Sequence, residues 1–335
     1  MKKILVLGAT GAMATYLVPL LLEKGMAVTG VSLDEPLVTH PSLRSVTANA
    51  LDMDFLTKEL AEGYDAIVDF MIYNTKEKFG EYYKLFLENT THYLFFSTYR
   101  IYAGDHPIRE DSLRLLEAKK PDVFVTELEY SIYKAEEEDM LRASGYQNYT
   151  IVRPAITYSQ RRFQLTILEG RNFLSRMRSG KTVLLPDSAM DKQATMSWAG
   201  DVARMLSAIL LNPKAYGETY TVSTAEHQTW REIAEMYSRI GGLVYKVIPE
   251  ADFLAFFDNN VYIKQQLLYD RCFDRVVDNT KILDLMGARQ EELMPLEEGL
   301  RMEYERLTEE DLARIGISEY LSAQMDAYLE KHGLL

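Results

Sequence analysis

A glycine-bearing stretch near the N-terminus has the composition of a phosphate-binding turn. The apolar residues 4–7 predict a strand, Gly8 and Gly11 follow it, and a helical pattern begins directly afterwards. Glycine adopts backbone conformations that other residues rarely reach, and it lets a ligand approach the main chain closely. The N–H groups and the positive dipole end of the following helix then suit a pyrophosphate. The spacing is G-x-x-G-x-x-A rather than the commonest dinucleotide fingerprint, so a plain strand-to-helix turn is the alternative.

Tyr130 and Lys134 are the second group of residues whose types and spacing could do chemistry. They stand four positions apart on a predicted helix and therefore share one of its faces. A tyrosine ionises with a pKa of about 10, and a nearby cation lowers that pKa by stabilising the phenolate. Such a pair could exchange a proton with a substrate. Because a pair at this spacing also arises by chance, a surface tyrosine and lysine without function are the alternative.

The composition of the chain argues against several classes of partner and site. Its 335 residues carry a formal net charge of −13 and no run rich in lysine or arginine, which argues against a nucleic-acid partner. The single cysteine, Cys272, excludes an internal disulfide and fits a reducing compartment. The five histidines are scattered without the spacing of zinc ligands, so we predict no metal site.

The first residues resemble a bacterial secretion signal, because Met1-Lys2-Lys3 precede an apolar stretch. However, two glycines interrupt that stretch, and it ends at Glu23-Lys24-Gly25 without a small-residue cleavage site. We therefore interpret residues 12–24 as the first helix of a cytoplasmic protein, with Gly25 at its C-terminal end. No segment approaches the ~20 uninterrupted apolar residues of a membrane span, so a membrane is not an expected partner.

Strands and helices alternate from residue 3 to about residue 155. This alternation predicts an α/β fold, a Rossmann-type doubly wound parallel sheet with helices on both faces. The strands after the first are predicted over residues 26–33, 44–48, 66–72, 93–97 and 149–153. In such sheets ligands bind beyond the carboxyl ends of the strands. Gly8, Ser32, Met71 and Thr98 occupy those ends.

The rest of the chain predicts a smaller C-terminal α+β substrate domain. We expect a dinucleotide-binding domain over residues 1–155, with its sheet completed by residues 196–225. Residues 156–195 and 226–335 then form the substrate-binding and C-terminal helical part.

The order of the motifs carries a resemblance. Ser97 and Thr98 end the fifth strand, Tyr130 and Lys134 follow on the next helix, and Arg153-Pro154 ends the sixth strand. This order resembles the extended short-chain dehydrogenase/reductases and, within them, the NAD-dependent epimerase/dehydratase family. Residues 96–102, 151–154, 198–203 and 277–281 are similar to further segments of that family. The resemblance covers roughly residues 1–300.

The resemblance implies roles for individual residues. Tyr130 would be the proton donor or acceptor, Lys134 would activate it and hold the nicotinamide ribose, and Thr98 would hydrogen-bond the reacting substrate oxygen. The cofactor-binding residues that it implies are Gly8, Thr10, Gly11, Ala12, Met13, Ser32, Asn49, Met71, Ser97, Tyr130, Lys134 and Arg153.

Besides Ala14, which replaces the third glycine of the turn, the sequence departs from the family pattern in three places. Ser32-Leu33 stands where members of the family place a ribose-binding acid or a clamp for a 2′-phosphate, and Asp34 follows. The cofactor is therefore NAD or NADP, and we expect the protein to discriminate only modestly between the two. Asn49 replaces the usual adenine-side aspartate, with Asp52 as the alternative. Ile156 replaces a polar residue that often touches substrate in the family, which weakens the inference that the substrate is a nucleotide sugar.

The resemblance implies an enzyme that transfers hydride between nicotinamide and a carbinol or ketone carbon of a small molecule. A sugar or a nucleotide sugar is a candidate for this substrate. The alternative is a non-catalytic dinucleotide-binding sensor or scaffold on the same fold. Sensors of this type commonly lose the tyrosine or the lysine, whereas this chain keeps both, so the enzyme is the preferred interpretation. Whether the protein assembles as a homodimer is left open.

Overall fold

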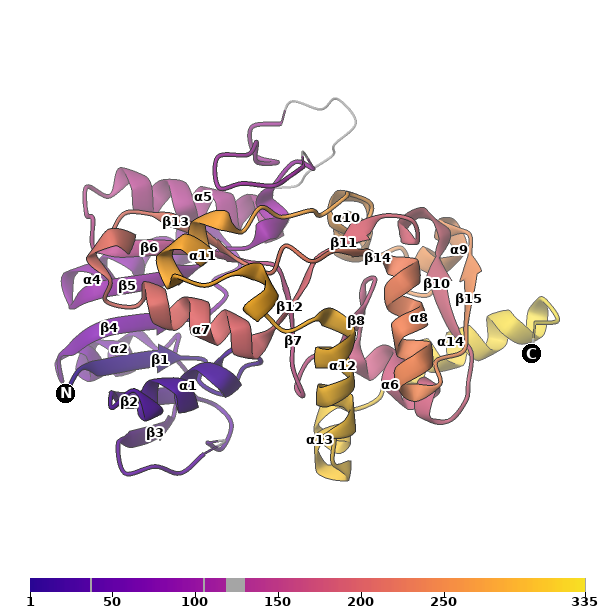
Figure 1. Cartoon of the computed structure of the whole chain (residues 1–335), viewed down its shortest axis with the longest axis horizontal. Helices are drawn as coiled ribbons and strands as arrows, with labels where there is room; N and C mark the ends of the chain where they lie inside the picture. The colour runs from indigo at the N-terminus through magenta and orange to yellow at the C-terminus, as the bar shows by residue number, and fades with distance from the viewer. Residues whose placement is uncertain (37, 105, 119–129, 335) are drawn as a thin grey trace.

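A parallel sheet organises the first two thirds of the chain (Figure 1). The computed structural model describes residues 1–36, 38–104, 106–118 and 130–334, and within them seven strands join this sheet in the order β13-β6-β5-β4-β1-β2-β3. The strands are β1 (Lys3–Leu7), β2 (Ala27–Ser32), β3 (Leu43–Thr47), β4 (Tyr64–Asp69), β5 (Thr90–Phe96), β6 (Tyr149–Pro154) and β13 (Thr219–Val222). Every neighbouring pair runs parallel. The order reverses direction between β1 and β4, which is where doubly wound sheets bind their ligands.

Helices cover both faces of the sheet because the strands are apolar on both sides. On β1, Ile4 and Val6 pack into one core with α1 (Ala14–Glu23), α7 (Ala199–Ile209) and α11 (Thr280–Met286). Leu5 and Leu7 point to the opposite face and pack with the second layer of helices. That layer contains α2 (Met53–Leu60), α3 (Lys76–Gly80), α4 (Tyr83–Glu88) and α5 (Tyr130–Ala143). The predicted α/β doubly wound fold is therefore confirmed.

The remaining segments build small sheets and helices around a core of their own. Their strands are β7 (Ile156–Tyr158), β8 (Gln164–Leu165), β9 (Leu168–Glu169), β10 (Val183–Pro186), β11 (Gln193–Ala194), β12 (Met196–Trp198), β14 (Gln228–Thr229) and β15 (Tyr245–Ile248). Their helices are α6 (Gly170–Arg178), α8 (Trp230–Gly241), α9 (Glu250–Ala255), α10 (Val261–Gln266), the π-helix Leu267–Arg271, α12 (Leu296–Glu305), α13 (Glu309–Ile315) and α14 (Glu319–Lys331). The short 3₁₀ helices are Tyr99–Ile101, Asp187–Ala189, Pro213–Ala215 and Gln290–Glu292. The domain boundaries given above stay predictions.

Local signals in the sequence start and stop the helices. Thr229 closes a capping box with Glu232 at the start of α8, and Gly25, with a φ of +75°, ends α1. One predicted helix is interrupted in the structure. The sequence predicts one helix before the fifth strand, with Phe79, Tyr83 and Phe86 on one side, whereas the chain forms α3 and α4 with a break between them. All three side chains are nevertheless buried on the same layer.

The described residues contain neither a helix that could span a membrane nor a cluster of metal-binding side chains. Among residues 1–36, 38–104, 106–118 and 130–334, no helix is long and apolar enough to cross a membrane. In the same ranges, no group of three or more histidine, cysteine, aspartate or glutamate side chains is arranged to hold a metal ion. The sequence predicts helical character over residues 127–143, and the structure describes this helix from Tyr130 onward, so the first three residues of the prediction lie outside the described part of the chain.

Candidate active site

The glycine turn between β1 and α1 is fixed against β2. Gly8 has a φ of +81°, a left-handed conformation that favours glycine. The N–H groups of Gly8 and Ala9 both donate to the carbonyl of Val31, at 2.9 and 3.0 Å. A Cβ on Gly30 would lie 2.9 Å from the Cβ of Ala9, so a glycine in β2 allows this close approach. Sequence reasoning missed Gly30, although an isolated glycine inside a predicted strand is a signal for close backbone approach.

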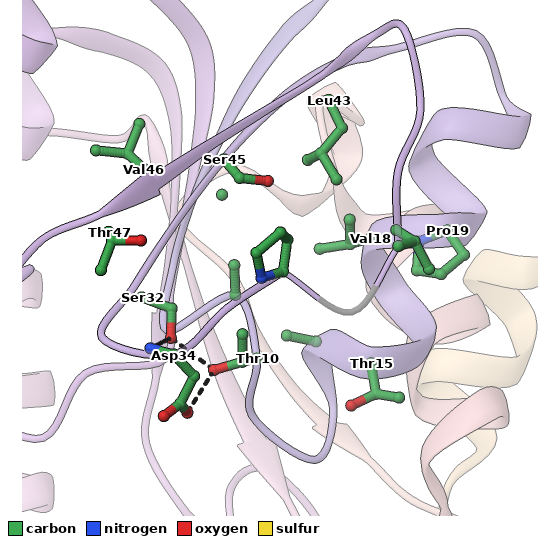
Figure 2. A pocket seen from close by; sticks show the side chains of 15 residues that line it. Thr10, Thr15, Val18, Pro19, Ser32, Asp34, Leu43, Ser45, Val46 and Thr47 are labelled. Carbon is green, nitrogen blue, oxygen red and sulfur yellow. Dashed lines mark hydrogen bonds between the residues drawn. The ribbon is translucent and has the colours of Figure 1, made fainter.

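Thr10, Ser32 and Asp34 form a cluster at the end of β2. Figure 2 shows these three side chains directed toward one another beside a small cavity of about 30 Å³. The hydroxyls of Thr10 and Ser32 are 2.6 Å apart, and the Thr10 hydroxyl donates to Asp34 Oδ2 at 3.1 Å. The cluster therefore holds the Asp34 carboxylate at the edge of the glycine turn. Asn49 is exposed and accepts a hydrogen bond from its neighbour Leu51, so the structure does not bring it to this cluster.

A larger cavity of about 360 Å³ lies at the carboxyl ends of β4, β5 and β6, and we call it the central cavity. Six of the predicted site residues line it together, namely Met13, Met71, Ser97, Thr98, Tyr130 and Lys134. The other lining residues are Phe70, Ile72, Phe96, Tyr99, Arg100, Pro154, Ala155, Ile156, Thr157, Arg162, Gln266 and Arg271. Met13 belongs to the turn before α1, so the cavity joins the glycine turn to the predicted catalytic residues.

Thr98 is positioned as a hydrogen-bond donor. Its side chain is buried, and its Oγ1 accepts the N–H of Arg100 at 3.2 Å, which caps the short helix Tyr99–Ile101. A hydroxyl that accepts one hydrogen bond keeps its own proton for another partner. Because Thr98 lines the central cavity, that proton can be offered to a ligand there.

Lys134 lines the central cavity and is surrounded by buried groups. Its side chain is 1% exposed, and its Nζ lies 2.9 Å from Oε2 of Glu137, one turn further along α5. The ammonium also lies 4.7 Å from the centroid of the Phe95 ring. Glu137 is completely buried, and burial raises its pKa to about 7 although Lys134 opposes the rise. An ammonium in such a place needs a counter-charge, which the ionised form of Glu137 supplies.

A second buried carboxylate lies close by on β4. Asp69 accepts hydrogen bonds from the hydroxyls of Tyr73 and Tyr93, both at 2.7 Å. Burial raises the pKa of Asp69, whereas these hydrogen bonds and Lys134 act against the rise. Sequence reasoning missed both carboxylates. Asp69 interrupts an apolar strand, which was the available signal, but nothing in the sequence marked Glu137.

Arg153 lies outside the central cavity. Its guanidinium donates twice to the Glu138 carboxylate, at 2.8 and 2.6 Å, and once each to the Tyr102 hydroxyl and the Glu110 carbonyl. Burial opposes ionisation, but Arg153 brings the pKa of Glu138 below its usual range. The structure therefore gives Arg153 a role in tying β6 to α5, and it does not bring this side chain together with the other predicted cofactor-binding residues.

Comparison with known proteins places the chain in a family. Residues 4–223 match the NAD dependent epimerase/dehydratase family. A solved structure of similar fold is UDP-glucuronic acid 4-epimerase from Bacillus cereus in complex with UDP-glucuronic acid and NAD. It is 18% identical, covers 90% of this chain and 98% of its own, and has a TM-score of 0.67. No curated protein matches this sequence closely enough to serve as a relative.

Two further solved structures show the same likeness. UDP-glucose 4-epimerase from Thermotoga maritima with UDP-glucose is 18% identical over 90% of this chain and 97% of its own, with a TM-score of 0.65. dTDP-glucose 4,6-dehydratase from Bacillus anthracis str. Ames in complex with NAD is 16% identical over 94% of this chain and all of its own, with a TM-score of 0.70. At these identities the structures establish the fold, whereas the sequence match over residues 4–223 covers well over half of the chain. The chain therefore belongs to the NAD dependent epimerase/dehydratase family.

Proposed function

We propose that the protein is an NAD-dependent enzyme that transfers hydride at a carbinol or ketone carbon of a sugar-type substrate. The observation that supports this proposal is that Thr98, Tyr130 and Lys134 line one cavity with Met13 of the glycine turn. The three solved relatives named above are enzymes of nucleotide sugars by their descriptions. A nucleotide sugar is therefore the first substrate class to try, even though Ile156 stands where a polar substrate contact is common in the family.

The residues of the turn fit a dinucleotide. Gly11 is exposed, and with Ala12 it lines a groove of about 610 Å³ beside Arg161. This leaves the main chain of the turn accessible to a pyrophosphate. In our proposal Gly11, Ala12 and Met13 hold the pyrophosphate, Ser32 lies near the adenine ribose, and Met71 and Ser97 lie toward the nicotinamide. NAD, when bound, supplies the hydride acceptor and donor for the reaction.

Tyr130 exchanges the proton in this proposal. When the substrate is oxidised, the phenolate of Tyr130 accepts the hydroxyl proton while the hydride leaves the same carbon. When the substrate is reduced, the phenol returns that proton to the oxygen. Lys134 stabilises the phenolate by its charge, and Thr98 donates a hydrogen bond to the reacting oxygen.

NAD is the preferred cofactor because of the cluster at the end of β2. Thr10 holds the Asp34 carboxylate there, next to Ser32. A carboxylate accepts hydrogen bonds from a ribose diol and repels a 2′-phosphate.

The test combines binding with turnover. We expect isothermal titration calorimetry to show NAD binding to the purified protein more tightly than NADP. We then expect NMR spectroscopy to detect conversion of UDP-glucose, UDP-glucuronic acid or dTDP-glucose. Conversion would support the enzyme. NAD binding with no conversion across a broad panel of sugar substrates would favour a sensor, and no binding of either dinucleotide would contradict the proposal.

A further inference from the structure

The walls of the central cavity carry positive charge although the protein is acidic. Aspartate and glutamate outnumber lysine and arginine by 50 to 37 in the whole chain. The described residues that line the central cavity nevertheless include Arg100, Lys134, Arg162 and Arg271 and include neither aspartate nor glutamate. A cleft lined by charges of one sign concentrates ligands of the opposite sign.

Two of these arginines are held in place by one carboxylate that both contact. Asp270 is 1% exposed and pairs with Arg271, and its Oδ2 lies 3.6 Å from Nε of Arg100. Nε of Arg275 contacts the other oxygen of Asp270 at 3.0 Å. Three guanidinium groups thus converge on one buried carboxylate, while Arg100 and Arg271 also face the cavity.

The closeness of these cations has an electrostatic consequence. Burial, with a smaller contribution from the Arg100 guanidinium, lowers the pKa of Arg271 to about 10. Its Nε donates to the carbonyl of Thr166 at 2.8 Å, which fixes the side chain in place. An anion in the cavity would stabilise the charged form of Arg271.

Arg100 places such an anion next to the proposed reaction. Its guanidinium carbon lies 5.1 Å from the centroid of the Tyr130 ring, and its backbone N–H donates to the Thr98 hydroxyl. An anionic group bound by Arg100 would therefore belong to the part of the substrate that reacts, rather than to a distant part.

We propose that the central cavity takes a substrate whose reacting part carries a carboxylate or a phosphate, and that Arg100 and Arg271 bind this group. The location of the reacting part rests on the proposed function. Guanidinium groups match the planar geometry of both anions with paired hydrogen bonds. A hydrogen bond between charged groups corresponds to an affinity gain of about tenfold or more.

Matched pairs of sugars test the proposal by calorimetry in the presence of NAD. UDP-glucose and UDP-glucuronic acid carry the same nucleotide and differ in one carboxylate. Glucose, glucuronic acid and glucose 6-phosphate distinguish a carboxylate from a phosphate without a nucleotide. We expect an acidic member to bind at least about tenfold more tightly than its neutral partner. Equal or tighter binding of the neutral partners, or binding of no acidic member at about 10 mM, would overturn the proposal.

Variants locate the anion. Arg100→Gln should abolish the preference for the acidic sugar and leave NAD affinity and the affinity of the neutral partner unchanged. Arg271→Gln should do the same, and Arg100→Gln decides the matter if the Arg271 variant fails to fold. Arg109→Gln is the matched control, because Arg109 pairs with Asp278 on the exposed surface and should leave the preference intact. A preference that survives Arg100→Gln would overturn the assignment. NAD binding is measured separately on each protein, so a failure of the proposed function is distinguishable from a failure of this inference.

Discussion

Glu137 shows how much the candidate site depends on charges that are buried away from water. It is completely buried and lies 2.9 Å from the ammonium of Lys134, which is itself almost completely buried. Tyr130, Lys134 and Glu137 occupy positions i, i+4 and i+7 of α5, so they form one stripe along the helix. The charged groups that face Glu137 are Lys134 and Glu138 on α5 and Asp69 on β4, with Tyr73 and Tyr93 beyond Asp69.

The raised pKa of Glu137 predicts how the free energy of unfolding depends on pH. Burial raises that pKa from 4.5 to about 7, so the folded protein retains this proton over a range in which the unfolded chain has lost it. The stabilising contribution is therefore fully present below about pH 4.5 and is lost as the pH rises through about 7. Glu137→Gln removes this dependence. We expect the free energy of unfolding of the wild type, relative to the variant, to fall by on the order of 3 kcal/mol between about pH 5 and about pH 8.

Urea denaturation at a series of pH values measures this difference. Glu136→Gln is the matched control, since Glu136 is the adjacent residue on α5 and pairs with Lys76 at 2.6 Å instead of Lys134. The control should follow the wild type. Parallel curves for the wild type and Glu137→Gln would show that the carboxyl group has an ordinary pKa.

The sequence predicted which residues would meet in the cavity but not what surrounds them. Thr98, Tyr130 and Lys134 were placed by the order of their motifs along the chain. The importance of Glu137 and Arg100 depends on burial and on contacts across the fold, which no local pattern records. Arg153 illustrates the opposite error, because a motif position does not determine which way a guanidinium points, and here it points to Glu138.

At the scale of elements, β1, the glycine turn and α1 are the unit that the sequence described best. A buried parallel strand reads as a continuous apolar run, and Gly8 and Gly25 mark its turn and the end of its helix. The short strands that follow residue 155 could not be predicted in this way. β8, β9, β11 and β14 have two residues each, too few to show any periodicity, and their pairing depends on long-range contacts.

Gly11→Leu tests the turn as a binding element. Gly11 is exposed and lines the groove of about 610 Å³, so a leucine there would project into space that the pyrophosphate needs. Because the position is exposed, we expect the melting temperature to stay close to that of the wild type. The affinity for NAD should fall by at least about a hundredfold, or 2.7 kcal/mol, in a calorimetric titration. A stable variant that binds NAD as tightly as the wild type would place the dinucleotide elsewhere.

At the scale of the whole molecule, segments that follow residue 155 reach back to the glycine turn and α1. Arg161 donates to the carbonyl of Thr10 at 2.9 Å, and Trp198 and Tyr16 both donate to Glu303 on α12. Figure 1 shows α12 and α13 between the seven-stranded sheet and α8. The groove that contains Gly11 is also lined by residues of these segments, among them Arg161 and Arg314. These contacts join residues at least 105 positions apart, so no local pattern in the sequence predicts them.

The central claim is that Tyr130 exchanges the proton in a site that binds NAD independently of it. The most direct measurement compares turnover and NAD affinity of Tyr130→Phe with those of the wild type, once a substrate is converted. Tyr133→Phe is the matched control, because Tyr133 is a buried tyrosine on the same helix whose ring lies 5.5 Å from that of Tyr130. We predict that Tyr130→Phe lowers kcat by about 10²–10⁴-fold with unchanged NAD affinity, while Tyr133→Phe retains turnover. Turnover by Tyr130→Phe at a rate close to that of the wild type would contradict the account.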